Sequence, residues 1–134
     1  MRKLIIAVLA ATVLTAPAVA EAKPRLSPEA KLEKMLEGRV AGEPQDCIYL
    51  PSIRSTRVFD KTAIVYDAGR TLWVNRPDNG ASSLDDDDIL VTRLHSSQLC
   101  SIDTVQLRDR SSHFYSGFVA LGDFVPYRKV AANR

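Results

Sequence analysis

The feature that most constrains the fold of this chain is the pairing of its two cysteines, Cys47 and Cys100. In an exported protein an even pair of cysteines indicates a disulfide. Such a bond would close a loop of about 54 residues and stabilise the fold by about 4 kcal/mol in the chain-entropy model. A metal pair and a catalytic thiol are the alternatives, but the sequence has no CxxC motif or histidine cluster to complete a metal site. We therefore expect a disulfide, with no metal and no other cofactor.

The start of the chain predicts export. Arg2 and Lys3 give a positive beginning, residues 4–14 form an apolar run, and small side chains occupy the −3 and −1 positions of a cleavage site after Ala20. The apolar run is shorter than the roughly 20 residues of a membrane-spanning helix. We expect residues 1–20 to be a signal peptide, and the mature protein to be periplasmic or secreted.

The mature chain is expected to be a flexible leader, residues 21–27, followed by one small globular domain, residues 28–134. Loss of the two basic signal residues leaves equal numbers of basic and acidic residues. Nucleic-acid-binding proteins usually carry a concentrated basic face, which this balance does not favour. No later segment is apolar enough for a transmembrane anchor after signal cleavage. We therefore expect neither nucleic acid nor a membrane span.

A short amphipathic helix is predicted over residues 28–37. Ser27 is a good N-cap, Pro28 suits the first helical position, and Gly38 is a natural stop. Apolar residues between them recur at spacings of three and four: Leu32, Met35 and Leu36. One narrow stripe of this kind favours docking of the helix on its own domain.

Short strands are predicted for the rest of the domain. The clearest signal is a hairpin, with β-branched and aromatic arms at 63–66 and 71–75 around a turn that contains Gly69. Other apolar or alternating runs predict strands at 47–50, 89–94, 105–107 and 118–125. Residues 53–59 either continue the first of these strands or form a turn, and residues 76–88 are expected to be a loop.

The order of elements indicates an α+β, mostly β fold. We expect the N-terminal helix to pack on a small curled antiparallel sheet, or an open barrel, of about five or six strands. Gly122 is expected at a bulge or bend of the last strand. Pro126 is expected at a sheet edge, because proline lacks the N–H that a central strand uses.

Three segments resemble a family of small exported proteobacterial proteins of unknown function. They are GRVAGEPQDCIYL (38–50), TAIVYDAGRTLWVNRP (62–77) and SSQLCSIDTVQLRDRSSHFYSGFVALGDFVPY (96–127). The resemblance spans residues 38–127 and implies a shared periplasmic domain that holds both cysteines. It implies no activity and no functional residues.

An acidic run is the most unusual local feature: Asp85, Asp86, Asp87 and Asp88. Oxygen ligands of this kind suit a hard cation such as Ca²⁺, and Asn79 and Gly80 lie just upstream. An EF-hand alignment fails, because Pro77 falls on a ligand position and Asp86 replaces the usual glutamate. A solvated acidic loop is the simpler interpretation, and it is the one we favour.

Histidine and arginine offer two further candidate sites. His95 and His113 are the only histidines, and each has serines beside it, but no GxSxG motif is present. We therefore assign no catalytic residue. An anion-binding patch is the second candidate, formed by Arg54, Arg57, Arg108 and Arg110. Its alternative is a solvated strand face with cross-strand ion pairs.

Aromatic residues line either a ligand pocket or the domain core, and the sequence leaves both open. They are Tyr66, Trp73, Phe114, Tyr115, Phe118, Phe124 and Tyr127. A flat exposed aromatic patch would favour a binding protein. A concave pocket that holds His95 or His113 beside aspartates would favour an enzyme.

The function we expect is a non-catalytic exported binding or envelope-associated domain, with another envelope protein as the partner class. The absence of a coherent catalytic set in the sequence motivates this interpretation. A small periplasmic hydrolase or metal-dependent enzyme is the first alternative. An inhibitor of a secreted enzyme is the second.

Overall fold

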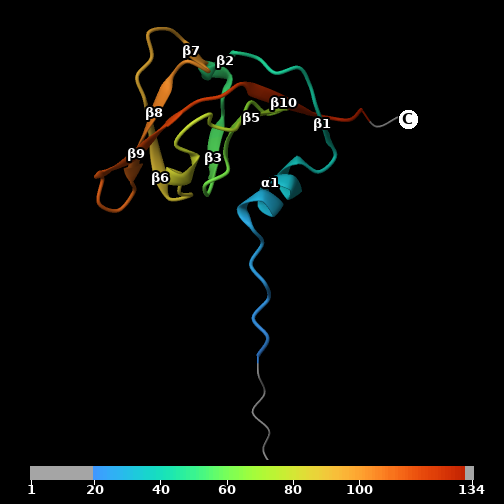
Figure 1. The fold of residues 1–134 in the computed structure, drawn as a ribbon. Coiled ribbons are helices and arrows are strands. Elements are labelled where there is room, and N and C mark those ends of the chain that lie inside the picture. Colours follow the sequence, from blue (N-terminus) through green and yellow to red (C-terminus); the bar gives the residue numbers. More distant parts are fainter. Residues whose placement is uncertain (1–19, 132–134) are drawn as a thin grey trace, which may run out of the picture.

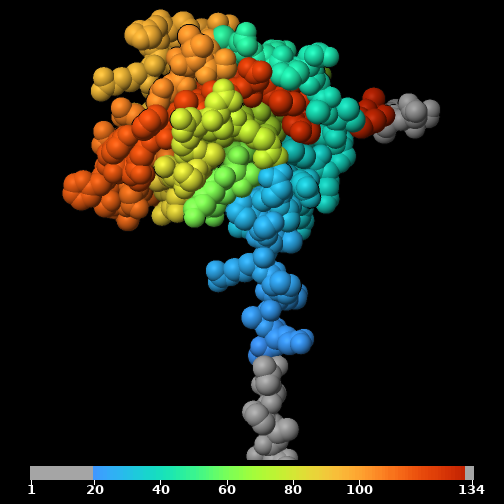
Figure 2. Space-filling view, in the orientation of Figure 1, coloured from blue at the N-terminus to red at the C-terminus, as the bar shows by residue number. Residues whose placement is uncertain are grey.

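A computed structural model of the chain describes residues 20–131 and shows a mostly β fold with one short helix (Figure 1). The predicted signal peptide, apart from Ala20, lies outside the described residues. The predicted leader, residues 21–27, is exposed throughout and projects away from the body of the protein (Figure 2).

Helix α1 (Pro28–Leu36) confirms the predicted helix to within one residue. The Ser27 hydroxyl accepts a hydrogen bond from the Ala30 N–H at 3.2 Å, which caps the first turn. Gly38 follows the helix with φ +73°, a left-handed conformation that glycine adopts without steric cost. The helix is anchored by Leu32, which is 0 % exposed, and by an ion pair of 2.6 Å between Glu29 and Arg76.

A five-stranded antiparallel sheet forms one side of the molecule. Its strands, in spatial order, are β1 (Arg39–Ala41), β10 (Phe124–Lys129), β5 (Thr71–Asn75), β4 (Ala63–Asp67) and β3 (Ser55–Phe59). The predicted hairpin is confirmed as β4 and β5, and Gly69 has φ +84° in its turn. Residues 53–59 therefore contain a separate edge strand, which resolves the ambiguity left by the sequence.

Two smaller antiparallel sheets complete the fold. The first contains β6 (Asp88–Thr92), β8 (Thr104–Asp109) and β9 (Tyr115–Ala120), in that spatial order. The second pairs β2 (Cys47–Tyr49) with β7 (Gln98–Cys100). Cys47 and Cys100 are register partners and form a disulfide, which confirms the predicted bond.

The structure corrects the expected barrel and strand count. The described residues form ten strands in three open sheets, and no barrel closes. The expected strand 118–125 is two strands, β9 and β10, separated at residues 121–123. Of the connecting residues, Leu121 is 1 % exposed and Gly122 is buried like residues of the strands, whereas Asp123 is exposed.

Gly122 lies where the expected strand is interrupted, whereas Pro126 is not at the expected sheet edge. Gly122 lies between β9 and β10, where a Cβ atom would come within 2.5 Å of the Arg76 carbonyl oxygen, so close approach requires glycine. Pro126 lies in β10, an inner strand of its sheet, which contradicts the expected edge position. Its carbonyl accepts from the Gly42 N–H, one residue beyond the end of β1. The Pro126 nitrogen, which has no hydrogen to donate, therefore faces a neighbouring strand that has just ended.

The core lies on both faces of the five-stranded sheet. One face packs against α1 through a cluster that contains Leu32, Phe59 and Val65. The other face meets the two smaller sheets through a larger cluster that contains Val58, Tyr66, Leu99 and Leu107 among others. Successive residues of β3 therefore point alternately toward these two clusters.

Candidate functional site

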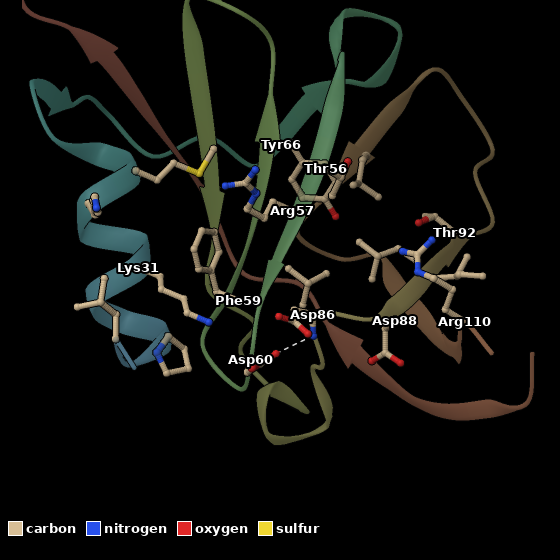
Figure 3. A pocket seen from close by; sticks show the side chains of 18 of the residues that line it. Lys31, Thr56, Arg57, Phe59, Asp60, Tyr66, Asp86, Asp88, Thr92 and Arg110 are labelled. Atoms are coloured by element: carbon tan, nitrogen blue, oxygen red, sulfur yellow. Dashed lines mark hydrogen bonds between the residues drawn. The ribbon is translucent and has the colours of Figure 1, made fainter. Parts of the chain in front are cut away.

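A groove of about 980 Å³ lies between α1, β3 and β6 (Figure 3). Its volume is at the upper end of the range of roughly 300–1,000 Å³ for small-molecule sites. Residues from all three elements line it, including Lys31 and Met35 of α1, Arg57 of β3 and Leu90 of β6. Segments about 60 positions apart in the sequence are thus brought to one concave surface.

The groove runs along the free edges of two sheets. β3 is the last strand of the five-stranded sheet, and β6 is an end strand of the three-stranded sheet. Thr56 and Val58 on one face of β3, and Arg57 and Phe59 on the other, all line the groove. Because side chains from both faces of β3 line the groove, the free edge of this strand lies along it. The same argument holds for β6, where Ile89 and its neighbour in sequence both contribute.

Hydrogen bonds close the groove at one of its ends. At one end the turn after β3 meets the segment before β6: the Lys61 N–H donates to the Leu84 carbonyl at 3.1 Å, and the Asp86 N–H donates to Asp60 Oδ1 at 2.6 Å. At the other end, Leu50 and Leu99 line the groove next to the disulfide-bonded strands β2 and β7. Between these ends, no ladder pairs β3 with β6 in the described part of the chain.

Tyr66 of β4 also lines the groove, and Figure 3 shows its ring beside Thr56 of β3. The residue is 4 % exposed, and its hydroxyl has no hydrogen-bond partner among the described residues. Burial raises the pKa of this hydroxyl above its ordinary value, so it remains a protonated donor. A buried polar atom without a partner is uncommon in native proteins and requires an explanation.

The charged residues of the groove are divided between its two sides. Lys31, Lys34 and Arg57 line the side of α1 and β3, and none of them forms an ion pair within residues 20–131. Arg110 lines the side of β6, where it pairs with Asp87 at 3.2 Å. Figure 3 shows Arg57 on the helix side of β3 and Arg110 toward β6.

The acidic run does not act as one site. Asp87 pairs with Arg110, while the buried Asp88 carboxylate accepts from the Ser116 hydroxyl at 2.9 Å and from the Asp85 N–H at 3.1 Å. Asp85 and Asp86 instead meet Asp60, and one carboxylate oxygen from each lies within 4.8 Å of the others. The sequence did not reveal Asp60, because it comes from the turn after β3. Exposed acidic groups often gather in this way without a metal ion, and the hydrogen bond from Asp86 to Asp60 accounts for part of the arrangement.

The predicted arginine patch is distributed over three places. Arg57 and Arg110 both line the groove. The Arg54 guanidinium lies over the turn between β4 and β5, 3.0 Å from the position of a Cβ atom built on Gly69. Arg108 donates to the carbonyl of His113 at 3.3 Å.

Neither histidine lies in the groove. His95 and His113 are both exposed, the first in the segment after β6 and the second in the turn between β8 and β9. The serines beside His113 are turn residues: the hydroxyls of Ser111 and Ser112 donate to Asp109 Oδ1 at 2.7 and 2.8 Å. The hydrogen bonds from these serines hold the pKa of Asp109 well below its usual range. Both serines are thereby engaged in the turn.

The aromatic residues divide into core and surface groups. Tyr66 and Phe124 are buried and meet edge to face with ring centroids 5.8 Å apart, while Trp73 and Tyr127 are partly buried against the two core clusters. Three others are on or next to β9 and are exposed by 50–76 %: Phe114, Tyr115 and Phe118.

No helix among the residues that the structure describes is long and apolar enough to cross a membrane. Comparison with known protein families, with curated proteins and with solved structures finds no match. The resemblance to the family of small exported proteins stays a prediction.

Proposed function

We propose that this protein is a non-catalytic extracytoplasmic binding domain, and that the groove between β3 and β6 is its ligand site. The observation that carries the proposal is the buried Tyr66 hydroxyl, which lines the groove and has no partner among the described residues. A ligand that accepts a hydrogen bond would satisfy it. An unpartnered buried hydroxyl costs about 1–3 kcal/mol, which is a reason to expect a ligand at this position.

Two features favour binding over catalysis. The groove contains aspartates but neither histidine, so the arrangement that would have favoured an enzyme is not formed there. Exposed aromatic side chains next to and on β9 are typical of proteins that bind partners. The disulfide is consistent with the extracytoplasmic location that the signal peptide predicts.

Site-specific photo-crosslinking tests the proposal. A benzophenone amino acid is placed at Thr56, which lines the groove, or at Thr104, an exposed threonine of β8 outside it. Each protein is exported in its host and irradiated in the intact envelope. We expect a defined adduct from position 56 that Thr92→Trp suppresses, because that substitution fills the groove from β6. Equal background at positions 56 and 104 would contradict the proposal.

A further inference from the structure

We infer that the ligand is an extended polypeptide segment that adds as a strand to the free edge of β3, with an acidic side chain against Arg57. This inference rests on the proposed function, because it names the class of ligand for the same groove. Three observations carry it: the geometry of the two strand edges, the apolar side of the groove around Tyr66, and the unpaired cations on the opposite side.

Strand edges offer backbone groups that only another backbone matches in number and spacing. An edge strand presents a row of unpaired N–H and C=O groups, and recognition by strand addition uses this row. β3 pairs with β4 in regular register over all five residues, without a bulge or proline that would block a further strand. β6 pairs as regularly with β8 on its inner side. Neither strand therefore has an irregularity in its ladder that would block pairing with a segment in the groove.

Alternate side chains of an added strand would meet two different surfaces. On the core side they face Leu50, Leu99 and the Tyr66 hydroxyl, which together accept an apolar group and a hydrogen-bond acceptor. On the helix side they face Arg57 and the aliphatic part of Met35. A polypeptide supplies this alternation with a period of two residues.

Charge selects an acidic residue on the helix side. Arg57 is exposed, and neither it nor the nearby Lys31 and Lys34 has an ion-pair partner within the described chain. Three acidic residues line the groove. Asp60 and Asp86 lie together at the closed end, where the Asp86 N–H donates to Asp60 Oδ1, and the buried Asp88 carboxylate accepts from the Ser116 hydroxyl. The acidic side chain of the ligand is therefore placed at the level of Arg57, away from that end.

Defined peptides test the inference on the oxidised mature protein. Three blocked peptides of about eight residues, slightly longer than a typical strand, are compared by calorimetry. The first alternates glutamate with threonine and valine, the second replaces glutamate by lysine, and the third replaces alternate residues of the first by proline. We expect the first to bind at least about fivefold more tightly than the second, from charge, and more tightly than the third, because proline cannot donate to a ladder.

Charge reversal provides the matched control. Arg57→Glu should reverse the preference between the glutamate and lysine peptides, whereas Arg128→Glu, at an exposed arginine of β10, should leave it unchanged. Hydrogen exchange at residues 55–59 should slow when the first peptide binds, since strand addition protects amides on the free edge. Both variants replace an exposed strand arginine by glutamate, so they are matched in chemistry and position. Their melting curves show whether either variant has lost its fold.

The outcomes separate the two proposals. If an adduct forms at Thr56 but no peptide binds, or if the captured molecule is a lipid or a glycan, the polypeptide class is wrong and the groove remains a ligand site. A concentration-dependent dimer that protects residues 55–59 without peptide would assign the groove to a second copy and overturn the inference. Equal binding of the glutamate and proline peptides would exclude strand addition. If neither adduct nor peptide binding is observed, both proposals fail.

Discussion

Removal of one oxygen atom, by Tyr66→Phe, is expected to stabilise the free protein. The ring packs edge to face on Phe124 and phenylalanine preserves that contact, while the hydroxyl has no partner to lose among the described residues. A buried hydroxyl without a hydrogen bond costs roughly 1–3 kcal/mol relative to its apolar counterpart. The free energy of unfolding at neutral pH should therefore rise by about 1–3 kcal/mol, whereas loss of a hydrogen-bonded hydroxyl lowers it.

The pH dependence of stability provides a second readout for the same variant. Burial raises the pKa of the Tyr66 hydroxyl above its ordinary value of 10.0, so the native state keeps its proton where the unfolded chain has released it. The contribution of this residue to stability is complete below pH 10 and decreases as the pH rises above it. The slope approaches 1.4 kcal/mol for each pH unit, at most. Tyr66→Phe has no such group, so its advantage should grow above pH 10.

Urea unfolding under non-reducing conditions measures both effects. Curves are recorded near neutral pH and near pH 11, about one unit above the ordinary tyrosine value, for the wild type and Tyr66→Phe. Tyr127→Phe, at a partly buried tyrosine next to the other core cluster, is the matched control. If Tyr66→Phe is less stable than the wild type at neutral pH, the hydroxyl has a partner in solution. The observation that supports a ligand in the groove would then be lost.

Four further expectations concern the disulfide, the helix, the acidic run and the signal peptide. Cys47→Ser and Cys100→Ser should each lower the free energy of unfolding by about 4 kcal/mol, and the double variant should add little, because either change opens the same loop; additive losses would contradict this. Leu32→Ala should cost about 2–5 kcal/mol in urea unfolding, since it empties the anchor of α1; a loss near zero would show that the helix is not docked. Millimolar Ca²⁺ should leave the melting temperature nearly unchanged. Ca²⁺ at one hundred times the Kd of a binding site would instead raise the free energy of unfolding by about 2.7 kcal/mol, and a rise in melting temperature that Asp86→Asn abolishes would reveal binding. The intact mass of the exported chain should correspond to a start at Glu21, and a chain that retains the first twenty residues would refute signal cleavage.

Local features of this protein were predictable because their causes are local. Ser27, Pro28 and Gly38 define the ends of α1 through backbone groups within one turn of each residue. The hairpin of β4 and β5 follows from two β-branched arms around a turn with a glycine. The disulfide was predictable for another reason: the compartment implied by the first twenty residues favours bonding of the only two cysteines.

Strand number and sheet closure were not predictable from pattern alone. β1 and β7 have three residues each, which is too short for an alternating pattern to stand out, whereas β2 was predicted from the apolar run at residues 47–50. The separation of β9 from β10 depends on the buried Asn75 side chain, which accepts from the Gly122 N–H and donates to the Gly122 carbonyl. These partners are 47 positions apart, so Gly122 could indicate a bend from the sequence, but not that the strand ends there.

The groove is the feature for which sequence reasoning had least to use. Arg57 and Arg110 were named as members of one anion patch, yet the structure places only these two in the groove and gives Arg54 and Arg108 other contacts. Tyr66 was named only as one aromatic residue among several. That its hydroxyl lacks a partner depends on every group packed around it.

The amino-acid sequence by itself therefore determined the α1 helix, the central hairpin, the pairing of the cysteines and the mostly β class. The helix, the hairpin and the β class follow from propensities, caps and turns that act over a few residues. The cysteine pairing follows because two cysteines can form only one disulfide with each other. Tertiary structure alone decided that the three sheets stay open and that the edges of β3 and β6 face each other across a groove. The physical reason is that a strand lies at an edge when no other strand pairs with one of its sides. Which strands pair depends on packing of the whole core rather than on any one segment.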